Sequence, residues 1–261
     1  MDILSEIVAH KQKEIAERKE LYPTKLLEKS TYFEGKPVSL KKYIQREDKS
    51  GVIAEIKRKS PSKGMINEHV SVEKVSIGYM QAGASGLSVL TDQNFFGGSS
   101  EDLVTARSFN FCPILRKDFM IDPYQVIEAK SMGADVILLI AAILKKEEIE
   151  ALAELARSLG MESLLEVHSE SELNSALTDK VDLIGVNNRN LKTFNTDIAT
   201  SKELSDKIPD EFTKVTESGL HSPEVVNELK EYGYEGFLIG ESFMKSGRPE
   251  RAAKEFISQI K

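Results

Sequence analysis

The sequence predicts an α/β fold, a (β/α)₈ TIM barrel with an extra N-terminal helical segment. The first observation is a unit that recurs eight times from Val52 onward: a short strand rich in Val, Ile and Leu, a polar loop and an amphipathic helix. The second is the apolar character of these strands, which is typical of a parallel sheet covered by helices. The third is the lack of a long break in composition across the units, which together have the size of one closed barrel.

The segment before the first strand has a helical pattern. From residue 1 to about residue 30, apolar residues recur at helical spacing with charges between them, and a second short helix is expected over 39–45. We expect the apolar stripes of both helices to cover one end of the main fold rather than to bind a partner. The chain is therefore interpreted as one domain, 1–261, in which 1–50 form a helical extension that packs on the barrel.

The repeating units supply eight predicted strands. They are expected at residues 52–58, 86–92, 113–119, 135–142, 163–168, 183–189, 212–218 and 236–242. Glycine follows several helical runs, as in KSMGADVILLI, where a left-handed residue commonly ends a helix. Helix starts are indicated by proline at Pro123, Pro223 and Pro249, and by the capping-box spacing of Ser169 and Glu172.

Two other architectures fit these units less well. A doubly wound open sheet usually needs fewer strands and, for dinucleotides, a G-x-G-x-x-G turn after a strand, which the sequence lacks. An αβ repeat solenoid would require units with a fixed period, whereas these vary in length.

Composition limits the partners. The 35 Lys and Arg residues against 42 Asp and Glu residues give a net charge of -7, which argues against a general nucleic-acid or anionic-membrane surface. The longest apolar run, 136–144, is far shorter than the ~20 residues that span a bilayer. The N-terminus lacks the apolar region of a signal peptide. We expect a soluble, cytoplasmic protein that binds neither nucleic acid nor membrane; a monomer is favoured, with an oligomer left open.

Cysteine and histidine usage bears on redox and metal chemistry. The single cysteine, Cys112, excludes an internal disulfide, and its neighbours Phe111 and Pro113 favour a buried position. The four histidines are scattered without metal-ligand spacing. We therefore expect no metal and no cofactor.

Polar side chains gather near the carboxyl ends of the predicted strands. Because residues two apart leave the same face of a strand, each pair reaches one side of the barrel wall. The set comprises Glu55 with Lys57, Lys117 with Phe119, Glu166 with His168, Asn187 with Arg189, and Glu217. Active sites of such barrels form at this end, and lysines and carboxylates in a partly desolvated site shift one another's pKa values, as acid–base chemistry requires.

Loops after three strands add binding features. The glycine-containing stretches TESGL and LIGES follow strands seven and eight, where such barrels often hold a phosphate through backbone N–H groups. The turn from Ser60 to Gly64 after the first strand supplies hydroxyls and an ammonium suited to an anion. Phe95 and Phe96 after strand two would suit an aromatic ligand.

Seven motifs occur in order along the chain: AEIKRKSPSKG, LTDQNFFGGS, ILRKDFMIDPYQ, LLEVHSESEL, IGVNNRNL, TESGL and FLIGESFM. Together they closely resemble the indole-3-glycerol-phosphate synthase family of tryptophan biosynthesis, over essentially the whole chain. The resemblance implies a cofactor-free carboxy-lyase that acts on 1-(2-carboxyphenylamino)-1-deoxyribulose 5-phosphate. Ring closure, loss of carbon dioxide and loss of water would yield indole-3-glycerol phosphate.

The resemblance also implies roles for individual residues. Lys117 would be the general acid for ring closure, and Lys57 would hold the anthranilate carboxylate and act as an acid later. Glu166 would serve as acid and base in the dehydration, and Asn187 would orient the substrate. Glu55, Arg189 and Glu217 would complete the polar network. Which lysine performs each proton transfer stays open.

The same resemblance places the rest of the substrate. The phosphate would lie among Ser60, Ser218, Gly219, Gly240 and the backbone N–H of Glu241. The ring would lie against Phe96, Phe119, Leu138, Leu191 and Leu238, with Phe96 preferred to Phe95 because a glycine follows it. The loop 59–67 is expected to close over substrate.

Two alternative functions stay open. Another phosphosugar barrel, such as a phosphoribosylanthranilate isomerase, would share the phosphate loops but not the paired lysines on strands one and three. A barrel that binds a phosphosugar without catalysis would have no need of the complete set of ionisable residues.

Overall fold

The computed structural model describes residues 3–191 and 193–261, and within them eight parallel strands close into a barrel. Each strand pairs with the next in sequence, and β1 closes the ring by pairing with both β4 and β10. The strands are β1 (Val52–Ile56), β4 (Gly86–Leu90), β5 (Ile114–Lys117), β6 (Val136–Ile140), β7 (Glu162–Val167), β8 (Leu183–Asn187), β9 (Thr213–Glu217) and β10 (Gly236–Ile239). The predicted barrel is confirmed.

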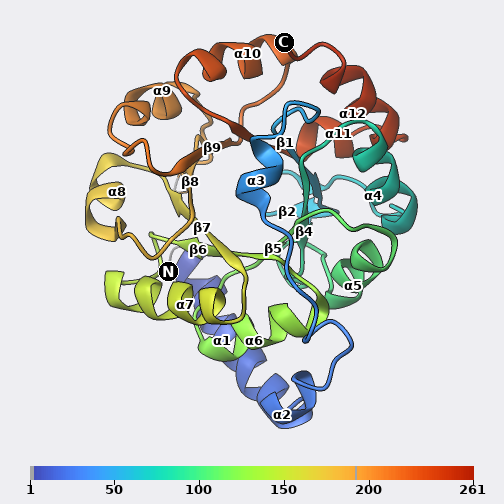
Figure 1. The fold of residues 1–261 in the computed structure, drawn as a ribbon, viewed down its shortest axis with the longest axis vertical. Helices are drawn as coiled ribbons and strands as arrows, with labels where there is room; N and C mark the ends of the chain where they lie inside the picture. Colours follow the sequence, from blue (N-terminus) through green and yellow to red (C-terminus); the bar gives the residue numbers. More distant parts are fainter. Residues whose placement is uncertain (1–2, 192) are drawn as a thin grey trace.

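Helices surround the barrel on its outer face (Figure 1). They are α4 (Val72–Gln81), α5 (Ser100–Phe109), α6 (Pro123–Met132), α7 (Lys146–Ser158), α8 (Glu170–Ala176), α9 (Ala199–Ser205), α10 (Pro223–Glu231) and α12 (Pro249–Ile257), with the short α11 (Glu241–Met244) before the last. The layer between strands and helices is apolar and buried throughout. The helices therefore supply the cover that such apolar strands require.

The predicted helix boundaries hold with one exception. Proline lies at the start of α6, α10 and α12, and Gly133 ends α6 with a φ of 87°. The capping box expected at the start of α8 forms only in half. Ser169 accepts a hydrogen bond from the backbone N–H of Glu172, but the Glu172 carboxylate accepts from the N–H of His168 instead of returning to Ser169.

The N-terminal extension contains more breaks than predicted. In place of one helix to about residue 30, α1 (Ile3–Leu21) ends before Pro23 and the single turn α2 (Thr24–Leu27) follows it; residues 1 and 2 lie outside the described residues. Proline disfavours helical geometry in the residue before it, which explains the break. The second predicted helix is confirmed as α3 (Leu40–Ile44), with Ser39 as its N-cap.

Helix α3 closes the amino end of the barrel, at the centre of the view in Figure 1. Leu40 and Ile44 pack against the apolar residues that point into the barrel. The fit is close: a Cβ on Gly86 would lie 2.8 Å from a methyl group of Leu40. Glu162 at the start of β7 holds the helix by accepting hydrogen bonds from Ser39 and from the backbone N–H of Leu40 at 2.8 Å.

Side chains alternate along each strand between the outer layer and the barrel interior. On β1, Val52, Ala54 and Ile56 belong to the outer layer, whereas Ile53 lies inside with residues such as Leu115. The next inward position on the carboxyl side is no longer apolar on several strands. This alternation turns a strand pattern into a site at one end.

Three strands end earlier than predicted, because their last residues make side-chain contacts in place of ladder pairs. After β1 the Arg58 guanidinium pairs with Asp102 of α5, and after β5 the Asp118 carboxylate accepts the N–H of Phe119 at 2.8 Å. After β10, Glu241 already begins α11. These corrections place Lys57, Phe119 and Glu241 on loops at the carboxyl end.

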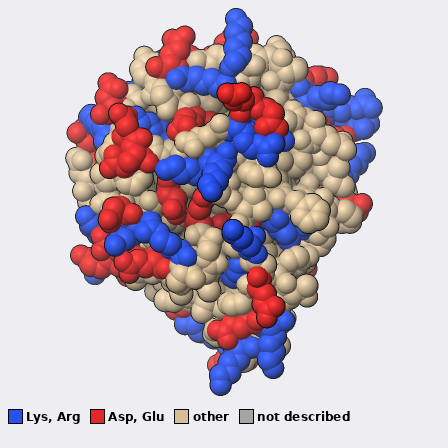
Figure 2. Space-filling model, viewed as in Figure 1, with Lys and Arg blue, Asp and Glu red and all other residues tan. Residues whose placement is uncertain are grey.

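Other predictions concern the exterior and the thiol. Cys112 is buried, as expected, and burial raises its pKa to about 12. In the described part of the chain, no helix has the length and apolar character needed to cross a membrane. Acidic and basic side chains are interspersed over the face seen in Figure 2.

Candidate active site

A cavity lies at the carboxyl ends of the barrel strands, on the side opposite α3. Every residue predicted for the site lines it. These are Glu55, Lys57, Ser60, Phe96, Lys117, Phe119, Leu138, Glu166, Asn187, Arg189, Leu191, Glu217, Ser218, Gly219, Leu238, Gly240 and Glu241. The sequence therefore located the cavity correctly, although residence in its wall does not assign a chemical role.

The barrel wall delivers the ionisable side chains to this cavity. Each follows an inward apolar residue by two positions: Glu55 follows Ile53, Lys117 follows Leu115, and Glu217 follows Val215. Because successive inward positions climb the same wall, an apolar barrel interior becomes a charged floor at the carboxyl end.

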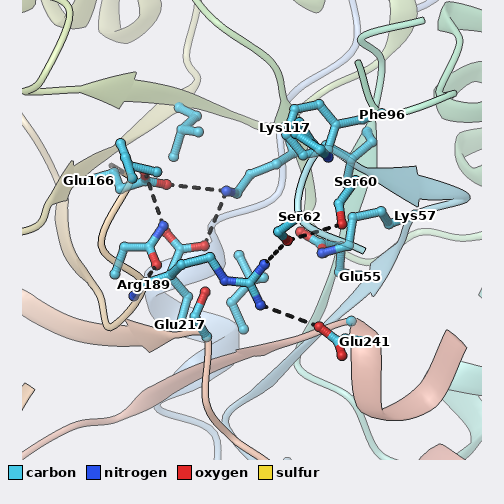
Figure 3. A pocket seen from close by; sticks show the side chains of 18 of the residues that line it. Glu55, Lys57, Ser60, Ser62, Phe96, Lys117, Glu166, Arg189, Glu217 and Glu241 are labelled. Atoms are coloured by element: carbon cyan, nitrogen blue, oxygen red, sulfur yellow. Dashed lines mark hydrogen bonds and ion pairs between the residues drawn. The ribbon is translucent and has the colours of Figure 1, made fainter. Parts of the chain in front are cut away.

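Lys117 lies at the centre of this floor (Figure 3). Its Nζ is 3.2 Å from Glu166 Oε2 and 3.1 Å from Glu217 Oε2. Asn187 Nδ2 donates to the other Glu166 oxygen at 3.4 Å. The three strands β5, β7 and β9 thus bring one ammonium and two carboxylates into direct contact.

The pKa values in this group diverge. Burial lowers the pKa of Lys117, but the carboxylates of Glu166, Glu217 and Glu55 raise it above its ordinary value. Burial raises the pKa of Glu166, yet Lys117 and hydrogen bonds with Glu217 and His168 hold it well below its usual range. Burial and the charge of Glu166 raise the pKa of Glu217 to about 8.

The site at neutral pH therefore contains a charged lysine and two carboxyl groups in different protonation states. Glu166 is ionised, whereas Glu217 keeps its proton up to a pH of about 8. Two adjacent carboxyl groups whose pKa values are driven apart can act as a base and an acid, respectively.

Lys57 and Glu55 form a second pair on β1 and its following loop. Lys57 Nζ is 2.5 Å from Glu55 Oε1, and Lys57 is the more exposed of the two. Gly240 makes room for this carboxylate, since a Cβ at that position would lie 2.4 Å from Glu55 Oε1. Glycine is therefore required by the close approach of β1 and the loop after β10.

Aromatic rings form one wall. The rings of Phe96 and Phe119 are tilted to one another with centroids 5.9 Å apart. Asp92 fixes the loop that carries Phe96 by accepting the N–H groups of Phe95 and Phe96 at 2.7 and 3.1 Å. Phe95 instead packs against His10 of α1, so the preference for Phe96 as the lining residue is confirmed.

The loop after β9 has an unusual backbone. Ser218 and Gly219 both have positive φ, 67° and 80°. Asn188 supports the turn by donating to the Ser218 carbonyl oxygen at 3.1 Å, and a Cβ on Gly219 would lie 2.9 Å from Thr196. Consecutive residues in such conformations can aim backbone N–H groups toward one anion.

Cations surround Glu241 at the neighbouring loop. Its carboxylate lies 2.7 Å from Lys245 Nζ, 3.3 Å from Arg189 and 3.9 Å from Lys63. Burial raises the pKa of Glu241, but Lys245 and the other cations bring it below the ordinary value. Arg189 also donates to Ser62, so it bridges the loops after β1, β8 and β10 (Figure 3).

Several residues of the site were not predicted. Ile3, Leu4 and Ile7 of α1 line the cavity, and Ser62 holds Arg189. Their helical spacing identified the α1 residues as apolar, but a stripe does not reveal which end of a barrel it covers. Among residues 3–191 and 193–261, no group of three or more His, Cys, Asp or Glu is arranged to hold a metal ion.

Solved structures share the fold. The α subunit of tryptophan synthase from Legionella pneumophila matches with a TM-score of 0.61 at 14% identity, covering 85% of this chain and 96% of that one. Thiamine phosphate pyrophosphorylase from Pyrococcus furiosus matches with a TM-score of 0.59 at 15% identity, covering 81% and 96%. At this identity the likeness concerns the barrel alone.

Sequence relatives are much closer. Proteins described as indole-3-glycerol phosphate synthase are 47% identical in Bacteroides thetaiotaomicron, covering 99% of both chains, and 43% identical in Bordetella pertussis, covering 95% of this chain and 96% of that one. The family profile described as indole-3-glycerol phosphate synthase matches residues 4–256. By both criteria, the chain belongs to the indole-3-glycerol phosphate synthase family.

Proposed function

We propose that this protein converts 1-(2-carboxyphenylamino)-1-deoxyribulose 5-phosphate to indole-3-glycerol phosphate, carbon dioxide and water. The observation that carries the proposal is the convergence of Lys117, Glu166 and Glu217 beside an aromatic wall in one cavity. Membership of the family supports the same reaction. The substrate has a matching order of parts: an aromatic acid, a ketose and a phosphate.

Lys117 is the acid of the first step. The ring carbon that bears the carboxylate bonds to the ribulose carbonyl carbon, and Lys117 donates a proton to the carbonyl oxygen. Because the surrounding carboxylates raise its pKa, Lys117 is charged when substrate arrives. A fixed cation at the oxygen where negative charge develops stabilises the transition state.

Lys57 holds the carboxylate that leaves. It is paired with Glu55 at 2.5 Å and lies at the cavity wall next to the loop after β1. When the carbon–carboxylate bond breaks, carbon dioxide departs and its electron pair restores the aromatic ring. Lys57 is then free to donate a proton to the departing hydroxyl, and the division of proton transfers between the two lysines is the part that kinetics must decide.

Glu166 provides acid–base chemistry for the dehydration. Its low pKa makes it an ionised acceptor that can take a proton from the newly formed ring as the hydroxyl leaves as water. Asn187 orients the substrate, while Glu55, Arg189 and Glu217 complete the polar network around it. The shared proton between Glu166 and Glu217 gives the acceptor a route to return its proton.

The ends of the substrate occupy opposite parts of the cavity. The aromatic ring lies against Phe96 and Phe119, and the leucine side chains complete this apolar part: Leu138, Leu191 and Leu238. The phosphate lies at Ser60 and the backbone of the loops after β9 and β10, through Ser218, Gly219, Gly240 and the N–H of Glu241. The cations around the Glu241 carboxylate offset its repulsion of the phosphate.

The loop 59–67 contains a two-stranded hairpin, β2 (Lys59–Ser60) and β3 (Gly64–Met65), paired in antiparallel fashion. Its position beside Ser60 and Ser62 suits a lid. Closure is tested by comparing proteolysis of the loop with and without a product analogue. Equal cleavage rates in both states would contradict it.

The reaction itself is tested by supplying the substrate and measuring carbon dioxide and the indole chromophore together. Release of both at equal rates is the expected result, and phosphoribosylanthranilate supplied alone should be left unchanged. Absence of carbon dioxide from a folded protein that binds the substrate would contradict the proposal.

Glu166→Gln tests the assigned base. Because the amide keeps the shape but cannot accept the proton, turnover should fall ~10²–10⁴-fold. Thermal unfolding and substrate affinity should change far less. A variant with most of its turnover would remove Glu166 from the mechanism.

A further inference from the structure

His168 forms a connection between the cavity and the outer helices. The residue follows β7 directly, and its side chain is 9% exposed. Its Nε2 lies 3.3 Å from Glu166 Oε1, and its Nδ1 lies 3.1 Å from Glu172 Oε2 in α8. The imidazole therefore lies between a carboxylate of the cavity and a carboxylate outside it.

The two contacts differ in kind. Glu172 Oε2 also accepts the backbone N–H of His168 at 2.8 Å, so this one oxygen fixes both the ring and the chain that carries it. On the other side, Nε2 is at ion-pair distance from Glu166 without its N–H being aligned for a hydrogen bond. The inner contact is therefore mainly one of charge.

We propose that His168 is a positioning residue: held by Glu172 as an imidazolium, it keeps Glu166 ionised and turned toward Lys117. The inference rests on the proposed function, because it concerns how Glu166 is prepared to accept a proton. His168 itself is not among the residues that line the cavity, so it acts through Glu166.

Electrostatics around Glu166 explain the need for such a cation. The charged and titratable groups that face it come from each neighbouring strand: Lys117 of β5, Glu217 of β9 and His168 after β7, while β8 adds the amide of Asn187. Glu55 of β1 adds a further negative charge near Lys117. Lys117 alone would have to balance all of these carboxyl groups.

The protonation of His168 agrees with this role. Burial lowers its pKa, but the contacts with Glu166 and Glu172 raise it to about 10. A cation that persists through neutral pH can hold its partner ionised throughout the working range. An opposite charge at this distance typically lowers a carboxyl pKa by ~1–3 units.

The first experiment measures the imidazolium directly and needs no activity. In protein with isotope-labelled histidine, the NMR signal of His168 is assigned by its loss in His168→Gln. The expected result is a charged ring from pH 6 to pH 9. A titration at the ordinary histidine value of ~6.5 would overturn the proposal.

The second experiment compares pH profiles. Gln at position 168 can donate a hydrogen bond but carries no charge, so Glu166 should take up a proton at higher pH. The acidic limb of kcat should move upward by about 1–3 pH units. Turnover should therefore fall tenfold or more at the acidic end and recover at alkaline pH, with KM less affected. An unchanged profile in folded His168→Gln would overturn the proposal.

Glu172→Gln is the matched control. It removes the outer carboxylate but leaves an imidazolium beside Glu166, so the acidic limb should stay in place even if overall turnover declines. If Glu172→Gln shifted the limb as far as His168→Gln, His168 would only support the start of α8, and the proposal would be wrong. If the wild-type protein released no carbon dioxide, the proposed reaction would fail, while the NMR titration would still decide the state of His168.

Discussion

Two buried ionic clusters lie back to back on β5, and they behave in opposite ways. The cavity cluster consists of Lys117, Glu166 and Glu217. The α1 cluster lies on the other face of the same strand end. It consists of Lys11, Arg18, Asp92, Arg116, Asp118 and Glu128.

Two carboxyl groups show the difference. Asp118 is 2% exposed and Glu217 is 4% exposed, so burial alone penalises the charge of both. Lys11 and Arg116 nevertheless hold the pKa of Asp118 below its usual range, whereas the charge of Glu166 helps raise that of Glu217 to about 8. Pairing, and not burial, decides which carboxylate stays ionised.

The α1 cluster is balanced and closed. Lys11 Nζ lies 2.9 Å from Asp118 and 3.1 Å from Asp92, and Arg116 lies 3.1 Å from Asp118 and 2.8 Å from Glu128. Its three cations match three carboxylates, which suits a structural tie between α1 and the loops after β4 and β5. The cavity cluster has an excess of carboxyl groups and opens to a ligand, which suits chemistry.

The largest expected effect separates the two clusters by activity. Lys117→Ala removes the proposed acid and should lower kcat by ~10²–10⁴-fold. Circular dichroism and substrate binding should stay close to wild type, because the neighbouring carboxyl groups can take up protons or face the open cavity. Lys202→Ala, which removes an ammonium paired with Glu228 on the outer helices, should retain full turnover. Substantial activity in Lys117→Ala would contradict the assigned role.

Stability should show the reverse order. Lys11→Met leaves Asp92 and Asp118 without their buried partner, and breaking a buried ion pair typically costs ~3–5 kcal/mol. Denaturant unfolding measures this loss. The control is Lys19→Met, in which a more exposed pair with Asp122 is removed from the same helix and the change should be at most ~1 kcal/mol. Equal losses in both variants would mean that the buried cluster has no special structural weight.

The smallest expected effect is a change in the pH dependence of stability. The folded pKa of Glu217, about 8, lies above its ordinary value of 4.5, so between these values the folded state binds a proton that the unfolded state has lost. Stability from this group is complete below pH 4.5 and declines as the pH rises toward 8. Glu217→Gln removes this decline.

The measurement is the free energy of unfolding of both proteins at pH 5 and pH 8. The wild type should lose stability relative to Glu217→Gln over this interval. His168 also titrates differently in the folded state, but it is present in both proteins and largely cancels in the comparison. A difference that is constant with pH would show that Glu217 is not held protonated.

The repeating pattern of apolar strands and amphipathic helices was sufficient to predict the barrel, because burial on both faces of a parallel sheet imposes that pattern locally. The polar residues that interrupt it, such as Glu55 and Lys117, identified the end that carries the cavity. The break at Pro23 was also readable from local chemistry, although the prediction ran past it. Family motifs then connected these positions to one reaction.

Tertiary structure decided which charges meet. Lys11 and Asp118 are 107 positions apart in the sequence, and neither has a local pattern that distinguishes a buried ion pair from two solvated side chains. The half-formed capping box at Ser169 shows the same point, because Glu172 has the right spacing but binds His168. Local periodicity determines the elements, whereas the partner of a charged side chain depends on the closure of the barrel, which brings distant strands and α1 within a few ångströms.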